Sequence, residues 1–297
     1  MIKKAPDKLA PRKSKSQMAE AWDRLKRRPM AVVSMVGLVL IVLIAVFADV
    51  LVDYQQDVVQ QDVYNKLASF SPEHWLGTDY LGRDLFARII YGTRIALVMG
   101  VGANLLTVAL ALVLSCCCAF FGGKVDLVIM RFVDILMSLP SLVLSIAICA
   151  GLGNGLWQLI IALAVGNLGP MTTMFRSSAL TIAHEEYMEA GKALGASNAW
   201  LMVKYMIPNM MSIILVQATS YVGMNILSGA TLSFIGLGVK APMPEWGMIL
   251  NDGLQYFTIY PRLVIIPGIA ILLTAFFITT FGDCLRDAFD PKLKGRA

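Results

Sequence analysis

Charged and reactive residues are scarce in this sequence of 297 residues. Lys, Arg, Asp and Glu make up 15% of it, well below the quarter usual in soluble domains, whereas 57% of its residues are hydrophobic. It contains two histidines, and it has no HExxH, GxSxG or Walker A pattern. The composition excludes a soluble globular protein, and no motif supports catalysis, a metal site or nucleotide binding by this chain.

The five cysteines also indicate no disulfide framework or metal centre. Cys116, Cys117 and Cys118 are consecutive in an apolar run, so on a helix they point about 100° apart and cannot share one metal ion. Cys149 and Cys284 lie in other apolar runs. We interpret all five as small packing residues. The first apolar run is too long for a cleavable signal peptide and has no small-residue cleavage site.

Long apolar runs dominate what is present. The first begins at Met30 and has 19 residues without a charge, about 28 Å as a helix and close to the ~30 Å hydrocarbon core of a bilayer. The sequence therefore predicts an all-α polytopic membrane protein with six transmembrane helices, a lipid bilayer being its first partner. The expected spans are 30–48, 95–121, 127–150, 156–175, 210–237 and 263–281.

The distribution of charge predicts how these spans are oriented. Residues 1–29 carry a net charge of +7, so the rest of the chain carries −2 of the total of +5. Beside a membrane span, such a tail is typical of a cytoplasmic segment rather than of nucleic-acid binding. With Lys292, Lys294 and Arg296 near the other end, both termini are expected to be cytoplasmic. The predicted segments are a basic tail (1–29), a first helix with an external segment (30–93) and a five-helix core (94–297) whose cytoplasmic loop is 176–208.

The longest polar island between apolar runs is 185–209, on the expected cytoplasmic side. Glu186, Ala190 and Ala193 recur at the spacing of one helical face, and Glu189 can pair with Lys192. The small residues there, Gly191 included, leave room for another surface. Three further residues organise the loop: Gly195 suits a helix stop, Asn198 a second helix cap, and Pro208 the first turn of a third helix. We interpret the loop as a docking helix for a cytoplasmic partner, with an ordinary amphipathic connector as the alternative.

The external segment carries its own motif between residues 74 and 94. Gly77 and Gly82 are assigned to turns, Thr78, Asp79 or Asp84 to the cap of the helix that follows, and Arg83 completes the motif. A metal site at His74 is disfavoured because a second histidine is lacking nearby.

Polar residues inside the spans suggest a hydrophilic pathway. The expected pathway residues are Asn104, Asn225, Ser228 and Thr231, with helix packing through small residues as the alternative. In the third span Arg131 and Asp134 are expected to pair or to snorkel near the cytoplasmic surface, and Pro140 is expected to kink the helix.

The polar loop also resembles a known motif. Glu189-Ala190-Gly191, then Gly195, then Ile207-Pro208, is similar to the EAA motif of binding-protein-dependent ABC transporter permeases, with glycine in place of the second alanine. The resemblance implies that this loop couples the permease to a cytoplasmic ATPase. The coupling positions are then Glu185, Glu186, Glu189, Ala190, Gly191, Lys192, Gly195 and Pro208.

Three more strings resemble the dipeptide, oligopeptide and nickel subgroup of these permeases. They are LGTDYLGRD (76–84), LSFIGLG (232–238) and GDCLRD (282–287). One departure stands out, because many relatives carry a glutamate where this chain has Gly229. The loss of that charge leaves the substrate undetermined.

The resemblance implies a MetI-like, type I ABC importer fold in the cell inner membrane. It further implies that the chain is not an enzyme but half of a translocation pathway for peptides, completed by a homologous permease subunit. An extracytoplasmic binding protein would deliver the substrate, and two ATPase subunits would bind ATP and Mg. Nickel, glutathione or another small solute stays open as substrate, and an ion-gradient-driven secondary transporter is the less favoured class.

Overall fold

The computed structural model describes residues 22–289, and within them the chain is helical, with no strand beyond one isolated bridge. The elements are α2 (Pro29–Val46), α3 (Ala48–Leu51), η1 (Tyr54–Val59), α4 (Leu85–Phe121), α5 (Gly123–Met137), α6 (Ser141–Leu152), α7 (Leu156–Ala183), α8 (Glu186–Ala193), α9 (Asn198–Leu201), η2 (Met202–Met206), α10 (Ile207–Asn209), α11 (Met211–Phe234), α12 (Trp246–Leu254) and α13 (Arg262–Phe289). The two elements η1 and η2 are short π-helical turns.

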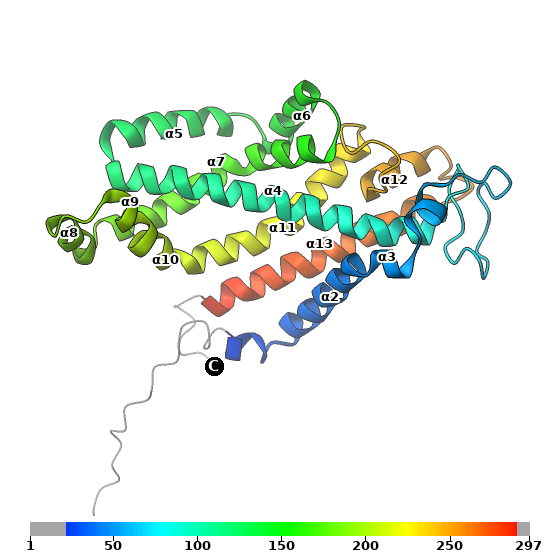
Figure 1. The fold of residues 1–297 in the computed structure, drawn as a ribbon, viewed down its shortest axis with the longest axis horizontal. Helices are drawn as coiled ribbons and strands as arrows, with labels where there is room; N and C mark the ends of the chain where they lie inside the picture. The colour runs from blue at the N-terminus through cyan, green and yellow to red at the C-terminus, as the bar shows by residue number, and fades with distance from the viewer. Residues whose placement is uncertain (1–21, 290–297) are drawn as a thin grey trace, which may run out of the picture.

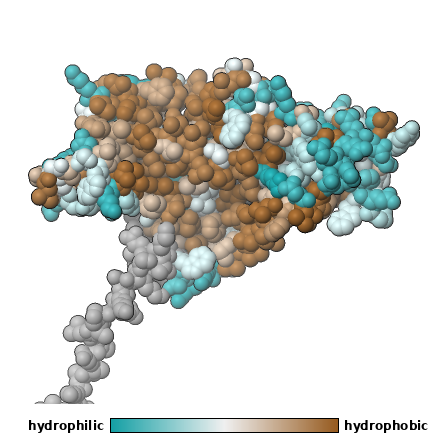
Figure 2. All heavy atoms as spheres, viewed as in Figure 1, coloured by the Kyte–Doolittle hydropathy of each residue, from teal (hydrophilic) through white to brown (hydrophobic). Residues whose placement is uncertain are grey.

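Five of these helices, α2, α4, α7, α11 and α13, are long and apolar enough to cross a membrane, and α5 with α6 makes a sixth span if the bent pair is counted as one. Figure 2 shows a hydrophobic band over the middle of the molecule, with hydrophilic residues gathered at the end that holds the segment before α4. The expectation of an all-α polytopic protein is confirmed.

The spans pack in successive layers (Figure 1). The helices α4 and α7 lie along each other, α11 lies between α4 and α13, and α2 packs on the far side of α13, while α5 and α6 cover the other face of α4 and α7. Glycine allows the closest crossings: a Cβ at Gly100 of α4 would lie 2.5 Å from Ile226 of α11, and one at Gly223 of α11 would lie 2.4 Å from Thr279 of α13.

The described ends of the chain lie at the same end of the molecule. Arg28, just before α2, forms an ion pair with Asp287 near the end of α13, and Arg24 donates to the carbonyl oxygen of Ala288 at 3.2 Å. The helices α8, α9 and α10 lie toward this end as well (Figure 1). Residues 1–21 of the basic tail and the closing Lys292, Lys294 and Arg296 lie outside the described residues.

The second span is longer than expected. The helix α4 begins at Leu85 rather than at Ile95, because the Asp84 carboxylate accepts a hydrogen bond from the Ala87 N–H at 2.8 Å and caps the helix. His74 lies 2.7 Å from the other Asp84 oxygen. The expected boundary between residues 93 and 94 therefore falls inside a continuous helix.

The third span is broken rather than kinked. The helix α5 ends at Met137, α6 begins at Ser141, and their axes differ by 88°. Pro140 has no N–H to continue the ladder of α5 and stands instead as the residue before the first turn of α6. The expected pair forms loosely, with 3.8 Å between Arg131 and Asp134.

Two spans extend past their expected ends, and one helix was not expected. The helix α7 continues to Ala183, so residues 176–183 of the expected cytoplasmic loop extend the helix of the fourth span, and α13 continues to Phe289 instead of Phe281. Arg176 in the extension of α7 pairs with Asp126 of α5, and Asp287 in the extension of α13 pairs with Arg28. The helix α12 forms in the segment expected to be an external loop, where Glu245 caps it.

Candidate functional site

The loop singled out by the sequence folds into a helical unit, α8 to α10, that protrudes beyond the spans. Its first helix ends in a Schellman motif: the N–H of Gly195 bonds to Lys192 at 3.0 Å, and the N–H of Ala196 bonds to Gly191 at 3.1 Å. Gly195 has φ +79°, a left-handed conformation that glycine adopts without strain. The predicted stop at Gly195 is confirmed.

One face of α8 is anchored to the spans. Met188 is fully buried in a cluster with Leu201 and Met206 from the rest of the unit, with Met210 at the start of α11, and with the end of α7. A Cβ at Gly191 would lie 2.6 Å from Leu201, so the small residue here admits the chain's own α9 rather than an outside surface.

Lys192 strengthens the same attachment. Its ammonium lies 4.7 Å from the ring centre of Phe120, in the last turn of α4, instead of pairing with Glu189 as expected. Within the unit the Tyr205 ring contacts two others: Tyr187 in a tilted arrangement, with ring centres 5.9 Å apart, and Trp200 edge-on, with ring centres 5.2 Å apart. Burial, and then the neighbouring Glu185, raises the pKa of Tyr187. The unit is thus tied to α4.

The opposite face of α8 is open in the described chain. The exposed residues there include Glu185, Glu186, Glu189, Ala190 and Ala193, and Leu194 beyond them is 88% exposed. Pro208 is also exposed and occupies the first turn of α10, as predicted. The cap of α9 is Ser197, which accepts from the Trp200 N–H, and not Asn198. A short helix with an anchored face and an open, acidic face can transmit the movement of a bound partner to the spans.

Two of the expected pathway residues are buried and form hydrogen bonds between helices of this chain. Asn104 and Asn225 are 2% and 0% exposed. Asn104 donates to the carbonyl oxygen of Ala218, and the Asn225 Oδ1 accepts from Asn167 at 2.8 Å. These bonds join α4 to α11 and α7 to α11, so the amides hold helices together and do not face an open route within this chain.

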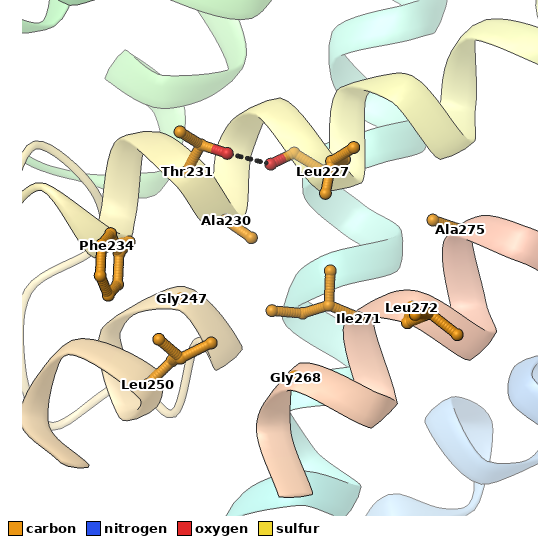
Figure 3. A pocket seen from close by; sticks show the side chains of 10 residues that line it. All are labelled: Leu227, Ala230, Thr231, Phe234, Gly247, Leu250, Gly268, Ile271, Leu272 and Ala275. Carbon is orange, nitrogen blue, oxygen red and sulfur yellow. Dashed lines mark hydrogen bonds between the residues drawn. The ribbon is translucent and has the colours of Figure 1, made fainter. Parts of the chain in front are cut away.

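The other two, Ser228 and Thr231, are partly exposed. Thr231 lines a cavity of about 550 Å³ between α11, α12 and α13 (Figure 3). Its hydroxyl donates to the Leu227 carbonyl oxygen at 2.8 Å, and the other lining residues are apolar or glycine. Gly229 faces elsewhere: a Cβ there would lie 2.3 Å from the sulfur of Met99. A glutamate there, as the resemblance led us to expect, would have to displace that side chain.

The external motif closes on itself through two glycine turns. Gly77 and Gly82 have φ +73° and +80°, and a Cβ at Gly82 would lie 1.8 Å from the carbonyl oxygen of Asp62. The Thr78 hydroxyl accepts from the Ala68 N–H at 2.8 Å. These contacts give the motif one defined shape.

Charges buried beneath the motif join it to α4 and α12. The Arg83 Nε lies 2.7 Å from an Asp79 oxygen, and the Arg88 Nε lies 3.6 Å from the same oxygen. Arg83 also reaches within 3.9 Å of Asp252 on α12. Burial raises the pKa of Asp252. The described residues contain no group of three or more histidines, cysteines or carboxylates that could hold a metal ion.

Sequence reasoning missed Glu245 and Trp246, which hold α12 in place. The Glu245 carboxylate is 1% exposed and accepts from the Met248 N–H at 2.9 Å, and burial raises its pKa. The Trp246 indole donates to the Ile89 carbonyl oxygen at 3.1 Å, in the space left by Gly92. An acidic residue before WGMILNDGL was the available signal for a capped helix.

Comparison with known proteins supplies independent evidence. Residues 95–295 match the family model described as the binding-protein-dependent transport system inner membrane component. Residues 16–72 match the N-terminal TM domain of oligopeptide transport permease C.

Two curated relatives align along nearly the whole chain. A dipeptide transport system permease protein of Alkalihalophilus pseudofirmus is 38% identical over 279 residues, covering 94% of this chain and 91% of the relative. A glutathione transport system permease protein of Pectobacterium atrosepticum is 36% identical over 276 residues, covering 93% and 91%.

Proposed function

This chain belongs to the family of binding-protein-dependent transport system inner membrane components, and on that premise we propose that it is a permease subunit of an ATP-driven importer for short peptides. The proposal of a peptide substrate is supported by the relatives, of which one is named for dipeptides and another for glutathione, itself a tripeptide. Glutathione is therefore the second candidate substrate.

The observation that carries the mechanism is the two-faced helix α8. Its buried face, centred on Met188, is continuous with the spans, and its exposed face is free to enter a partner. Two cytoplasmic ATPase subunits would bind ATP and Mg and close on each other, and each would move the coupling helix docked in it. Because Met188 and Lys192 tie α8 to α11 and α4, that movement would reach the spans, which would alternate between outward and inward openings.

The remaining partners follow from the same arrangement. A homologous permease, as a heterodimer with this chain, would complete the pathway, and an extracytoplasmic binding protein would deliver solute at the end formed by the external motif and α12. Both termini and α8 would be cytoplasmic, which agrees with the Arg28–Asp287 pair joining the two ends of the described chain. This chain would have no catalytic activity of its own.

Reconstitution with partner ATPases in proteoliposomes tests the proposal. Uptake of a labelled dipeptide should require ATP and the binding protein and should not respond to an imposed proton gradient alone. Glu189→Lys should reduce recovery of the ATPases with the permease, because it reverses a charge on the exposed face of α8. Glu73→Lys makes the same reversal on an exposed carboxylate at the other end and should leave that recovery unchanged. Equal recovery with both variants would refute docking at α8.

A further inference from the structure

A polar stripe runs along the exposed face of α5. Lys124, Arg131, Asp134 and Ser138 follow one another at steps of seven, three and four residues, so they share one side of the helix axis. The side chains of Arg131 and Asp134 are 75% and 56% exposed. The opposite side of α5 holds Val133, which is fully buried against α7.

The stripe extends from the membrane surface toward its middle. Asp126, near the start of α5, is held by Arg176 of α7, with 2.6 Å between Nε and Oδ1. At a rise of 1.5 Å per residue, Arg131 lies about 7.5 Å along the axis from Asp126, and Ser138 about 18 Å. The hydrocarbon core is about 30 Å thick, so Ser138 lies well inside it.

The helix break at the end of the stripe is equally exposed. Ser138, Leu139 and Pro140 separate α5 from α6, and all three are exposed in the described chain. Non-helical backbone facing lipid would leave peptide groups without partners, at several kcal/mol each. Such backbone occurs at membrane depth where it meets protein or lines a water-filled cavity.

The charges lead to the same conclusion independently. Facing lipid at mid-bilayer, a charged residue costs about 2.5–3.5 kcal/mol on insertion scales, and the short side chain of Asp134, about 12 Å along the axis from Asp126, cannot reach the surface as the long side chain of Arg131 can. An ion pair this exposed, with 3.8 Å between its atoms, offsets at most about 1 kcal/mol of that cost. The exposed stripe of α4, which carries Val98, Val101 and Leu105, is wholly apolar, whereas the polar residues of α5 are interleaved with the exposed Leu127 and Ile135. The α5 face that carries these charges is therefore unsuited to lipid, whereas the stripe of α4 suits it.

We infer that the polar stripe of α5, with the α5–α6 break, forms one wall of the water-filled route through the permease. This inference rests on the proposed function. Arg131 and Asp134 engage each other only weakly, so both charges are available to a solute. A zwitterion such as a peptide with free termini suits this wall, because its carboxylate meets the guanidinium and its ammonium meets the carboxylate.

Thiol labelling in the assembled transporter tests the wall directly. Ser138→Cys and Arg131→Cys are compared with Leu105→Cys on the apolar stripe of α4. Leu105 is matched in depth to Ser138: it lies 16 residues, about 24 Å, before the end of α4 at Phe121, and Ser138 lies 15 residues, about 23 Å, after the start of α5 at Gly123. The probe is a charged methanethiosulfonate ammonium reagent supplied on both sides of proteoliposomes, and the parent chain with its five native cysteines sets the baseline.

Both α5 thiols should react at least about tenfold faster than the Leu105→Cys thiol, because the thiolate that reacts forms in water and not in lipid. The inference is wrong if Ser138→Cys reacts as slowly as Leu105→Cys, even when Arg131→Cys is fast. ATP-driven uptake by the parent is measured in the same vesicles. Absence of uptake would refute the proposed function, and the labelling rates would still show whether this face of α5 is exposed to water.

Discussion

Removing the side chain of Met188 should loosen the coupling helix from the spans. Met188 is fully buried at the base of α8, and truncation of a buried methionine to alanine typically costs about 2–5 kcal/mol. If α8 opens as a local unit, this loss multiplies its open population by about 30- to 4,000-fold, since 1.4 kcal/mol is a factor of ten. ATP-driven uptake should fall because α8, without the buried contact of Met188, no longer transmits movement to the spans.

Hydrogen exchange of the α8 amides in the purified permease measures that opening. Met188→Ala should accelerate their exchange, and Met188→Leu, which nearly conserves volume, should restore most of the protection. Leu194→Ala is the matched control: Leu194 is 88% exposed, so its loss should leave exchange unchanged and affect only binding of the ATPases. Unchanged α8 exchange in Met188→Ala would refute the reasoning that this side chain anchors the lever.

Three other expectations concern single residues. Gly195→Pro imposes φ near −65° where the chain has +79°, so ATPase recovery and uptake should fall while membrane insertion stays normal by fractionation; full uptake would contradict it. Trp246→Phe removes the bond to Ile89 and should lower stability by about 0.5–1.5 kcal/mol, seen as a reduced Tm in detergent. Burial raises the pKa of Glu245, so its contribution to stability is complete below the ordinary pKa of glutamate and is lost as pH rises through the elevated value. Glu245→Gln should flatten the dependence of Tm on pH over that range, and an unchanged dependence would show that another group is responsible.

Local features of the coupling loop were predictable because they depend on neighbouring residues. Gly195 stops α8 through its own backbone freedom, and Pro208 begins α10 through its fixed φ. The prediction of a Glu189–Lys192 pair was wrong because the Lys192 ammonium lies over the ring of Phe120, 72 positions earlier in the chain. Spacing along one helix carries no information about that contact.

Span ends were less predictable than span existence. Arg88 and Arg176 appear too polar for a transmembrane helix when the sequence is read alone. Both nevertheless lie inside long helices, because Asp79 and Asp126, from other segments, form ion pairs with them. Likewise, the interpretation of Asn104 as a pathway residue stays a prediction without support from its environment, since the amide is buried and bonded to Ala218.

The sequence by itself determined that this protein lives in a membrane and carries a helical element beyond its spans, because hydropathy and turn chemistry are properties of local residues. Only the tertiary structure decided which face of each helix is covered. Gly191 turned out to admit α9, while the charged face of α5 was left open. The physical reason is that burial depends on contacts between segments distant in the chain. Periodicity predicts which residues share one face of a helix, but not which segment packs against that face.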